Sequence, residues 1–256
     1  MDLGLRDKVA IVTGASRGIG RSIAMGLADE GCNLAICSRG EEALQEAAQA
    51  MRDKGAEVVA VAADVTQEDG TKQIIDQAIA SFQHVDVLVN NVGGSNWKPF
   101  VEQSDQDWQN IIDLNLFAAI RMCRRVVPIM EQQGSGSIIM ISSIWGRELG
   151  GPSSYNATKA AEIGLAKNLA KELAPKGIRV NTVAPGSILF PGGGWDQRQK
   201  ADPKGMASFV KQNMPIGRFG RPEEIANVVV FLASERASLV TGACINVDGC
   251  QSHSLI

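Results

Sequence analysis

The chain has 256 residues, of which 45% are hydrophobic and 21% are charged, and its formal net charge is −3. This is the composition of an ordinary globular protein with enough length to bury a sizeable core. The negative charge argues against nucleic acid or an anionic membrane as a partner. Five cysteines without a C-x-x-C pair and only two histidines suggest neither a disulfide framework nor a metal site. No apolar run marks a signal peptide or a membrane span, so we expect a cytoplasmic protein without metal.

The first predicted element is a strand at residues 8–13, a short apolar run rich in β-branched side chains. A glycine-rich loop at residues 14–20 follows, and an amphipathic helix begins near Gly18. This order predicts a phosphate cradle, because glycines let the backbone approach a pyrophosphate and a helix start offers free N–H groups. The spacing G-x-x-x-G-x-G differs from the general dinucleotide fingerprint, and a glycine turn that binds nothing is the alternative.

The second predicted strand, at residues 33–38, ends at Ser38 and Arg39. In dinucleotide-binding units, an acid about twenty residues after the glycine loop binds the ribose hydroxyls of NAD, and no acid stands here. A guanidinium from Arg39, or from Arg17 inside the glycine loop, would instead bind a 2′-phosphate. The pattern favours NADP over NAD, unless Arg39 is only a solvated loop residue.

Strands and helices alternate along the rest of the chain. Further strands are predicted at about 57–63, 86–90, 136–143, 178–184 and 243–247, and helices at about 41–54, 67–82, 103–131, around Tyr155 and from 222 onward. We expect a glycine-rich, irregular segment at about 187–214 to form a substrate lid. The alternation predicts an α/β fold: one Rossmann-like, doubly wound domain spanning 1–256, with a mostly parallel, seven-stranded sheet and helices on both faces.

The only tyrosine of the chain, Tyr155, stands four residues before Lys159 in a run with helical periodicity. Residues four apart share one helix face, so a phenol and an ammonium are held side by side. An ammonium about 4 Å away at an effective dielectric of about 20 supplies roughly the 4 kcal/mol that a tyrosine needs to exchange a proton at neutral pH. The pair predicts a general acid and base, against the plainer alternative of a half-buried aromatic beside an exposed lysine.

Taken together, these motifs resemble the single-domain branch of the short-chain dehydrogenase/reductase family over residues 8–249. The resemblance implies reversible hydride transfer between NADP(H) and a carbonyl or secondary alcohol. The motifs that carry it are T-G-x-x-x-G-x-G at 13–20, Asp64-Val65, N-N-x-G at 90–93, Asn115, Ser142-Ser143, Y-x-x-x-K at 155–159 and Pro185-Gly186.

The resemblance also implies a role for each site residue. Tyr155 would be the general acid and base, Ser143 would bind the substrate oxygen, and Lys159 would assist Tyr155 and bond the nicotinamide ribose. Asn115 would interrupt its helix and hold a water beside Lys159. The implied cofactor contacts, besides Tyr155 and Lys159, are Gly14, Ser16, Arg17, Gly18, Ile19, Gly20, Ser38, Arg39, Asp64, Val65, Asn91, Val92, Gly93, Pro185, Gly186 and Ile188.

Three positions depart from the family pattern. Val92 is larger than the usual alanine, and Phe190 replaces a threonine that would contact a cofactor phosphate. The spacing to Tyr155 indicates Ser142 as the substrate-binding serine, whereas the strand end indicates Ser143, which we prefer. Since side chains alternate across a strand, only one of the two can face the site if the strand stays regular.

The substrate is expected to be a small carbonyl or alcohol, and Trp97, Trp145 and Trp195 lie on segments that should flank its pocket. A 3-oxoacyl-[acyl-carrier-protein] reductase is the alternative, although residues 131–134, ahead of the fifth strand, offer no basic residue for a phosphorylated carrier and only Lys176 remains. A non-catalytic cofactor sensor is a more remote alternative, because such proteins lose the catalytic residues that are present here. The resemblance further implies a homotetramer, with an apolar C-terminal stretch at residues 239–247 as a candidate interface.

Overall fold

The computed structural model describes residues 2–255 and has a sheet of seven parallel strands at its centre. The strand order is β3-β2-β1-β4-β5-β6-β7, which is the doubly wound order of dinucleotide-binding folds with one strand added at an edge. The predicted Rossmann-like sheet is therefore confirmed. The strands are β1 (Val9–Thr13), β2 (Asn33–Ser38), β3 (Val58–Ala62), β4 (Val87–Asn90), β5 (Gly136–Ile141), β6 (Ile178–Pro185) and β7 (Cys244–Val247).

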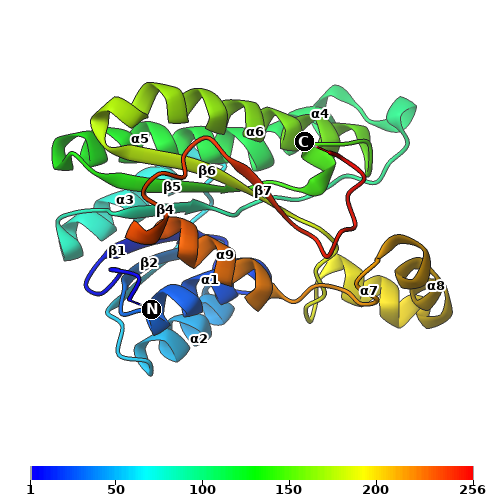
Figure 1. Ribbon diagram of the computed structural model, residues 1–256, viewed down its shortest axis with the longest axis horizontal. Helices are drawn as coiled ribbons and strands as arrows, with labels where there is room; N and C mark the ends of the chain where they lie inside the picture. The colour runs from blue at the N-terminus through cyan, green and yellow to red at the C-terminus, as the bar shows by residue number, and fades with distance from the viewer. Residues whose placement is uncertain (1, 256) are drawn as a thin grey trace.

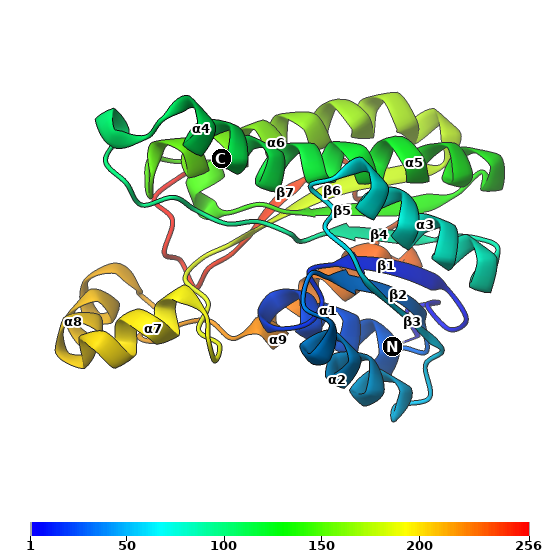
Figure 2. The same ribbon diagram turned by 180° about the vertical axis from the view of Figure 1, so that it is seen from behind.

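Helices cover both faces of the sheet (Figures 1 and 2). One face carries α1 (Gly18–Asp29), α2 (Glu41–Arg52) and α9 (Pro222–Ala233), and the other carries α3 (Glu68–Phe82), α5 (Ala118–Gln133) and α6 (Ser153–Leu173). Short 3-10 turns occur at Phe100–Glu102, Ile144–Gly146, Ala174–Lys176 and Glu235–Ala237.

The strands are buried on both faces, which explains their near-continuous apolar sequences. In β1 all five residues are buried. Ala10 and Val12 pack into the core under α1 and α9, and Ile11 packs into the opposite core, because successive side chains of a strand point to opposite faces.

The strand order reverses beside β1. The chain leaves β1 toward β2 on one side, whereas β4 pairs with β1 on the other, with Val12 opposite Val89. Parallel sheets bind ligands in the crevice outside the carboxyl ends of the strands at such a reversal. The loops that start at Gly14 and Asn91 border this crevice.

The predicted helix at 103–131 is divided in the structure. Helix α4 (Asp105–Ile112) is followed by a π-helical turn at Asp113–Phe117, and α5 then continues in α-helical form. Ser104 and Asp107 form a reciprocal capping box at the start of α4, which is a strong helix start signal. The π-helical turn places Asn115, fully buried, at the interruption.

The prediction of an irregular segment at 187–214 is wrong. Two helices occupy most of it, α7 (Gly194–Ala201) and α8 (Pro203–Asn213), and Figure 1 shows them as a projection at one end of the molecule. Asp202 ends α7, and its carboxylate accepts a hydrogen bond of 2.9 Å from Gly205 N to cap α8, with Pro203 at the first helical position. Asp followed by Pro is a helix start, and the glycines before it obscured this signal.

Within residues 2–255, every helix is too short or too polar to cross a lipid bilayer.

Candidate active site

A cleft of about 750 Å³ lies at the carboxyl ends of the strands and extends from the glycine loop to Tyr155 and α7. It gathers side chains from segments separated by more than a hundred residues. All the residues predicted for the site line this cleft except Gly18 and Asn115, which lie directly behind its wall.

The glycine loop is shaped by two close contacts. A Cβ on Gly20 would lie 2.4 Å from Asn91 Nδ2 and 2.4 Å from Gly14 O, so a side chain here would displace the loop. Asn91 in turn donates from Nδ2 to Thr13 O at 2.9 Å, which joins the ends of β1 and β4. Gly14 has a φ of +68°, a conformation that suits glycine.

The amino end of α1 points its backbone N–H groups into the same region. Among the described residues, no side chain caps this end of α1, and the first turn of the helix contains no acidic residue. Free N–H groups and the positive end of the helix dipole make such an end a site for anions. A dinucleotide pyrophosphate therefore fits this loop.

Phe190, the replacement for the family's threonine, packs against the glycine loop. A Cβ on Gly18 would lie 2.7 Å from the Phe190 ring, so the ring covers Gly18 and keeps it out of the cleft. Nearby, Arg17 Nη1 donates to Gly192 O at 3.4 Å. The chain before α7 is thus bonded to the loop on which a pyrophosphate would sit.

The far end of the cleft lies at the end of β2. Arg39 is exposed there, and Ser38 Oγ donates to Gly40 O at 3.0 Å. The Asp64 carboxylate accepts from Thr66 N at 2.9 Å and from Thr66 Oγ1 at 2.8 Å, so it is held in its own turn. The exposed Arg39 side chain lies at this end of the cleft, and Arg17, which donates to Gly192 O, borders the cleft from the glycine loop.

Tyr155 lies half-buried in the first turn of α6. Its ring meets Trp145 edge to face, with centroids 6.2 Å apart and planes at 88°. The Lys159 ammonium lies 5.8 Å from the centre of the same ring. The predicted pairing of the phenol with the ammonium on one face of a helix therefore exists in space.

The Lys159 ammonium is buried beneath Tyr155. Nζ donates to Ile141 O at 2.9 Å and lies 2.9 and 3.2 Å from the two oxygens of Glu162. Burial alone would lower the pKa of Lys159, but attraction to Glu162 and Tyr155 outweighs it and the pKa is raised. Burial raises the pKa of Glu162 to about 7. Glu162 was not predicted as a site residue, although the sequence shows an acid one helical turn after the lysine of Y-x-x-x-K.

The two serines at the end of β5 have different partners. Ser142 Oγ donates to Lys159 O at 2.8 Å, so its proton is used within the protein. Ser143 Oγ accepts from Trp145 N at 3.1 Å, and its own proton remains available to the cleft. Both side chains are almost fully buried and border the cleft.

Asn115 joins the β4 loop to α6. Its Oδ1 accepts from Gly94 N at 2.8 Å, and its Nδ2 donates to Gly94 O at 3.0 Å and to Thr158 Oγ1 at 2.9 Å. A Cβ on Gly93 would lie 3.2 Å from Asn115 Oδ1 and 3.1 Å from Lys159 Nζ. Asn115 thus sets the distance between the Gly93 loop and the lysine.

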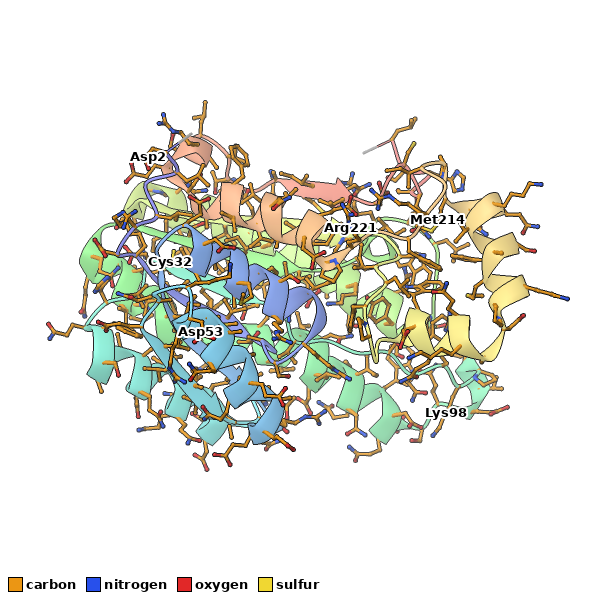
Figure 3. The ribbon with its side chains drawn as sticks, turned by 90° about the horizontal axis from the view of Figure 1, so that it is seen from below. Asp2, Cys32, Asp53, Lys98, Met214 and Arg221 are labelled. Carbon is orange, nitrogen blue, oxygen red and sulfur yellow. The ribbon has the colours of Figure 1, made fainter. Side chains whose placement is uncertain are left out.

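An aromatic wall closes the substrate end of the cleft. Trp97 meets Trp145 edge to face at 6.1 Å, and the Arg198 guanidinium stacks 4.1 Å from Trp97 and 5.0 Å from Trp195. Figure 3 shows the neighbouring residues Lys98 and Met214 at the same end of the molecule. Arg198 therefore links α7 to the 91–104 loop. It was not predicted, although its spacing of three residues from Trp195 on α7 was visible in the sequence.

A second cavity, of about 540 Å³, lies at the amino ends of the strands near Lys8, Asp86 and Arg179. Lys8 and Asp86 form an ion pair at 3.1 Å there, and Arg179 is bonded to backbone carbonyls. Across the described part of the chain, no three His, Cys, Asp or Glu side chains gather as a metal site would require.

Comparison with known proteins gives relatives that extend over nearly the whole chain. A family model described as enoyl-(acyl carrier protein) reductase matches residues 14–251. The 3-oxoacyl-[acyl-carrier-protein] reductase of Staphylococcus epidermidis is 42% identical over 246 residues, covering 95% of this chain and 98% of that protein. The structure of L-sorbose reductase from Gluconobacter frateurii, complexed with NADPH and L-sorbose, is 38% identical, with a TM-score of 0.95 and full coverage of both chains. A 7α-hydroxysteroid dehydrogenase complexed with NADH and 7-oxo glycochenodeoxycholic acid is 34% identical, with a TM-score of 0.91, covering 100% of this chain and 98% of that one.

Proposed function

This chain belongs to the short-chain dehydrogenase/reductase family of oxidoreductases, and from that premise we propose that it is an NADPH-dependent reductase of small polar ketones that also oxidises the matching secondary alcohols. The observation that carries the proposal is the single cleft in which Tyr155, Lys159 and Ser143 meet the glycine loop. Hydride transfer needs the proton-transferring side chains in one part of a crevice and the loop that binds the cofactor in another part of the same crevice.

Arg17 and Arg39 support NADP as the cofactor. Both side chains are exposed and border the cleft. Arg39 stands at the end of β2, where NAD-binding sheets place an acid, and Arg17 stands in the glycine loop. Guanidinium groups bind a 2′-phosphate through paired hydrogen bonds. The glycine loop and the amino end of α1 would hold the pyrophosphate, and Pro185, Gly186 and Ile188 would border the nicotinamide.

The cofactor supplies the hydride that is added to the carbonyl carbon. Ser143 donates its free proton to the carbonyl oxygen as a hydrogen bond and so orients it. Tyr155 then gives its hydroxyl proton to that oxygen, and the phenolate left behind is stabilised by the Lys159 ammonium. Two of the three Lys159 donors are used by Ile141 O and Glu162, so one remains to face the cleft.

The likeness to L-sorbose reductase guides the proposed substrate, since the two chains match over their full lengths. Trp97, Trp145 and Arg198 fit a polyhydroxy ketone, because aromatic faces pack on sugar rings and chains while a guanidinium bonds hydroxyls. We expect polyhydroxy ketones to be the best substrates.

Reduction of 3-oxoacyl groups on an acyl carrier protein is the second candidate, because of the 42% identity to the Staphylococcus epidermidis enzyme. A phosphorylated carrier needs a basic surface, and Lys176 is the one basic residue that the sequence analysis retained for this contact. Its ammonium lies 2.5 Å from the Glu131 carboxylate, which neutralises it. This ion pair favours the small ketone over the carrier-bound substrate.

NADPH absorbance provides the test. A panel of polyhydroxy ketones, simple ketones and an acetoacetyl carrier protein is assayed with NADPH and with NADH. We expect ketone reduction with NADPH to dominate, and a preference for the carrier-bound substrate would reverse the choice between the two candidates. Tyr155→Phe should bind NADPH as the wild type does, by fluorescence titration, yet lose activity by about 10²–10⁴-fold. Wild-type-like turnover from this variant would refute the role of Tyr155.

A homotetramer is part of the same proposal. Strand β7 is paired on one side only, to β6, and Leu239 just before it is 96% exposed. An unpaired edge strand beside an exposed apolar side chain is a natural contact between subunits. Light scattering should give four times the chain mass, and a monomer would contradict the proposal.

A further inference from the structure

A buried carboxylate lies against Lys159, and the mechanism described above gives it no role. The Glu162 side chain is 2% exposed, and the Lys159 side chain is 4% exposed. An acid is almost never fully buried unless a partner compensates it. The same position on the inner face of α6 could hold an apolar residue, as Ala166 and Ala170 do on the following turns. The acid therefore needs a functional explanation.

The groups that act on Glu162 are few. Lys159 from its own helix is the charged neighbour, Tyr155 acts through that ammonium, and the hydroxyl of Ser142 is the polar neighbour at the end of β5. Among the other charged residues on elements packed against α6, Asp105 is exposed, and the rest have contacts elsewhere: Arg179 with Leu232 O, Asp113 with Arg121, Asp107 with Lys98 and Lys176 with Glu131.

The electrostatic consequence follows from this arrangement. An ionised Glu162 cancels much of the Lys159 charge, whereas a protonated Glu162 leaves that charge free to act on the phenol. Burial raises the pKa of Glu162 to about 7, so both states occur near neutral pH. Glu162 also holds the ammonium in place, together with Ile141 O.

We propose that Glu162 is a positioning residue that anchors the Lys159 ammonium beneath Tyr155 and, through its own charge, sets the pH range in which Tyr155 accepts a proton. The inference rests on the proposed oxidoreductase function. Tyr155 and Glu162 are seven residues apart on α6, which is about 10 Å along a helix. A unit charge at that distance and an effective dielectric of about 20 changes a proton equilibrium by about one pH unit.

The test is the pH profile of kcat/KM for alcohol oxidation with NADP⁺. Glu162→Gln keeps the shape of the side chain and removes its charge. We expect the rise of the profile at its acidic side to move to lower pH by about one unit, because the phenolate is then favoured by an uncancelled ammonium. Glu172→Gln is the control, since it removes the same charge from an exposed position at the far end of α6 and should leave the profile in place.

The outcomes separate the two proposals. A wild-type protein without NADPH-dependent turnover on any substrate of the panel would refute the proposed function. An active wild type whose profile is unchanged in Glu162→Gln would overturn only the inference about Glu162, and would leave the residue as packing for Lys159.

Should Glu162→Gln not fold, two measurements replace it. Glu162→Leu removes the charge with a side chain of about the same volume, and the same shift is expected. Infrared difference spectra of the wild type between pH 5 and 8 should also show a protonated carboxyl that ionises near pH 7. Complete ionisation of all carboxyls by pH 6 would overturn the inference.

Discussion

Replacement of Asn115 by alanine tests whether one buried amide holds the loop after β4 and helix α6 in register. The Asn115 side chain is fully buried in the π-helical turn and makes three hydrogen bonds of 2.8 to 3.0 Å. Two of them go to Gly94 in the loop after β4, and the third goes to Thr158 on α6. Asn115→Ala removes all three and leaves the loop without its attachment to the helix.

The expected loss of stability can be estimated from these bonds. Each contributes about 1 kcal/mol net. Thr158 Oγ1 still donates to Ser154 O at 2.9 Å, so it stays partly satisfied, whereas both polar groups of the Gly94 backbone lose their protein partner. The sum is about 3 kcal/mol, and for a chain of this size each kcal/mol lowers the midpoint of thermal unfolding by about 2–4 °C. A decrease of about 6–12 °C is expected.

Thermal unfolding followed by circular dichroism measures the decrease, and NADPH fluorescence titration measures the effect on the loop. Asn110→Ala is the control, since Asn110 is exposed on the preceding helix and its side chain accepts one bond, from Gln106. That change should alter stability by no more than about 0.5 kcal/mol. If Asn115→Ala unfolds within 2 °C of the control and binds NADPH equally well, the reasoning about this amide is wrong.

Two further predictions concern Arg198 and Glu162. Arg198→Met removes the guanidinium stacked between Trp97 and Trp195, a contact of about 1 kcal/mol. The KM for the ketone should therefore rise about fivefold while kcat changes little. An unchanged KM would show that α7 does not hold the substrate. Since the pKa of Glu162 is raised from 4.5 to about 7 in the folded protein, the stability it contributes is complete below pH 4.5 and is lost as pH rises through 7. Urea unfolding at pH 4.5 and pH 8 should therefore show the wild type losing up to about 3 kcal/mol relative to Glu162→Gln, and a constant difference between the two proteins would contradict the raised pKa.

The strands and the glycine loop were predictable because their signals are local. Residues 8–20 combine a β-branched apolar run, a glycine-rich turn and a helix start, each visible within a few positions. The pairing of Tyr155 with Lys159 was predictable for the same reason, because helix geometry alone places residues four apart on one face. The conformation of residues 187–214 was misjudged because three glycines, 192–194, concealed the helix start that Asp202 and Pro203 provide for α8.

The contacts between distant segments required the folded chain. Phe190 lies on Gly18, and Arg198 lies between Trp97 and Trp195, and no periodicity connects residues so far apart in sequence. The different hydrogen bonding of Ser142 and Ser143 also needed the folded structure, since only there does the Ser142 hydroxyl meet its acceptor, Lys159 O.

The sequence by itself determined the doubly wound sheet, the place of the crevice and the pairing of Tyr155 with Lys159 on one helix face, because these follow from short-range pattern and from the fixed geometry of helices and strands. The tertiary structure alone decided what surrounds that pair: the acid buried beneath the lysine, the amide that ties loop to helix, and the cation held between two indoles. Burial and electrostatic pairing depend on which distant residues fill the same volume, and that is settled only when the chain packs.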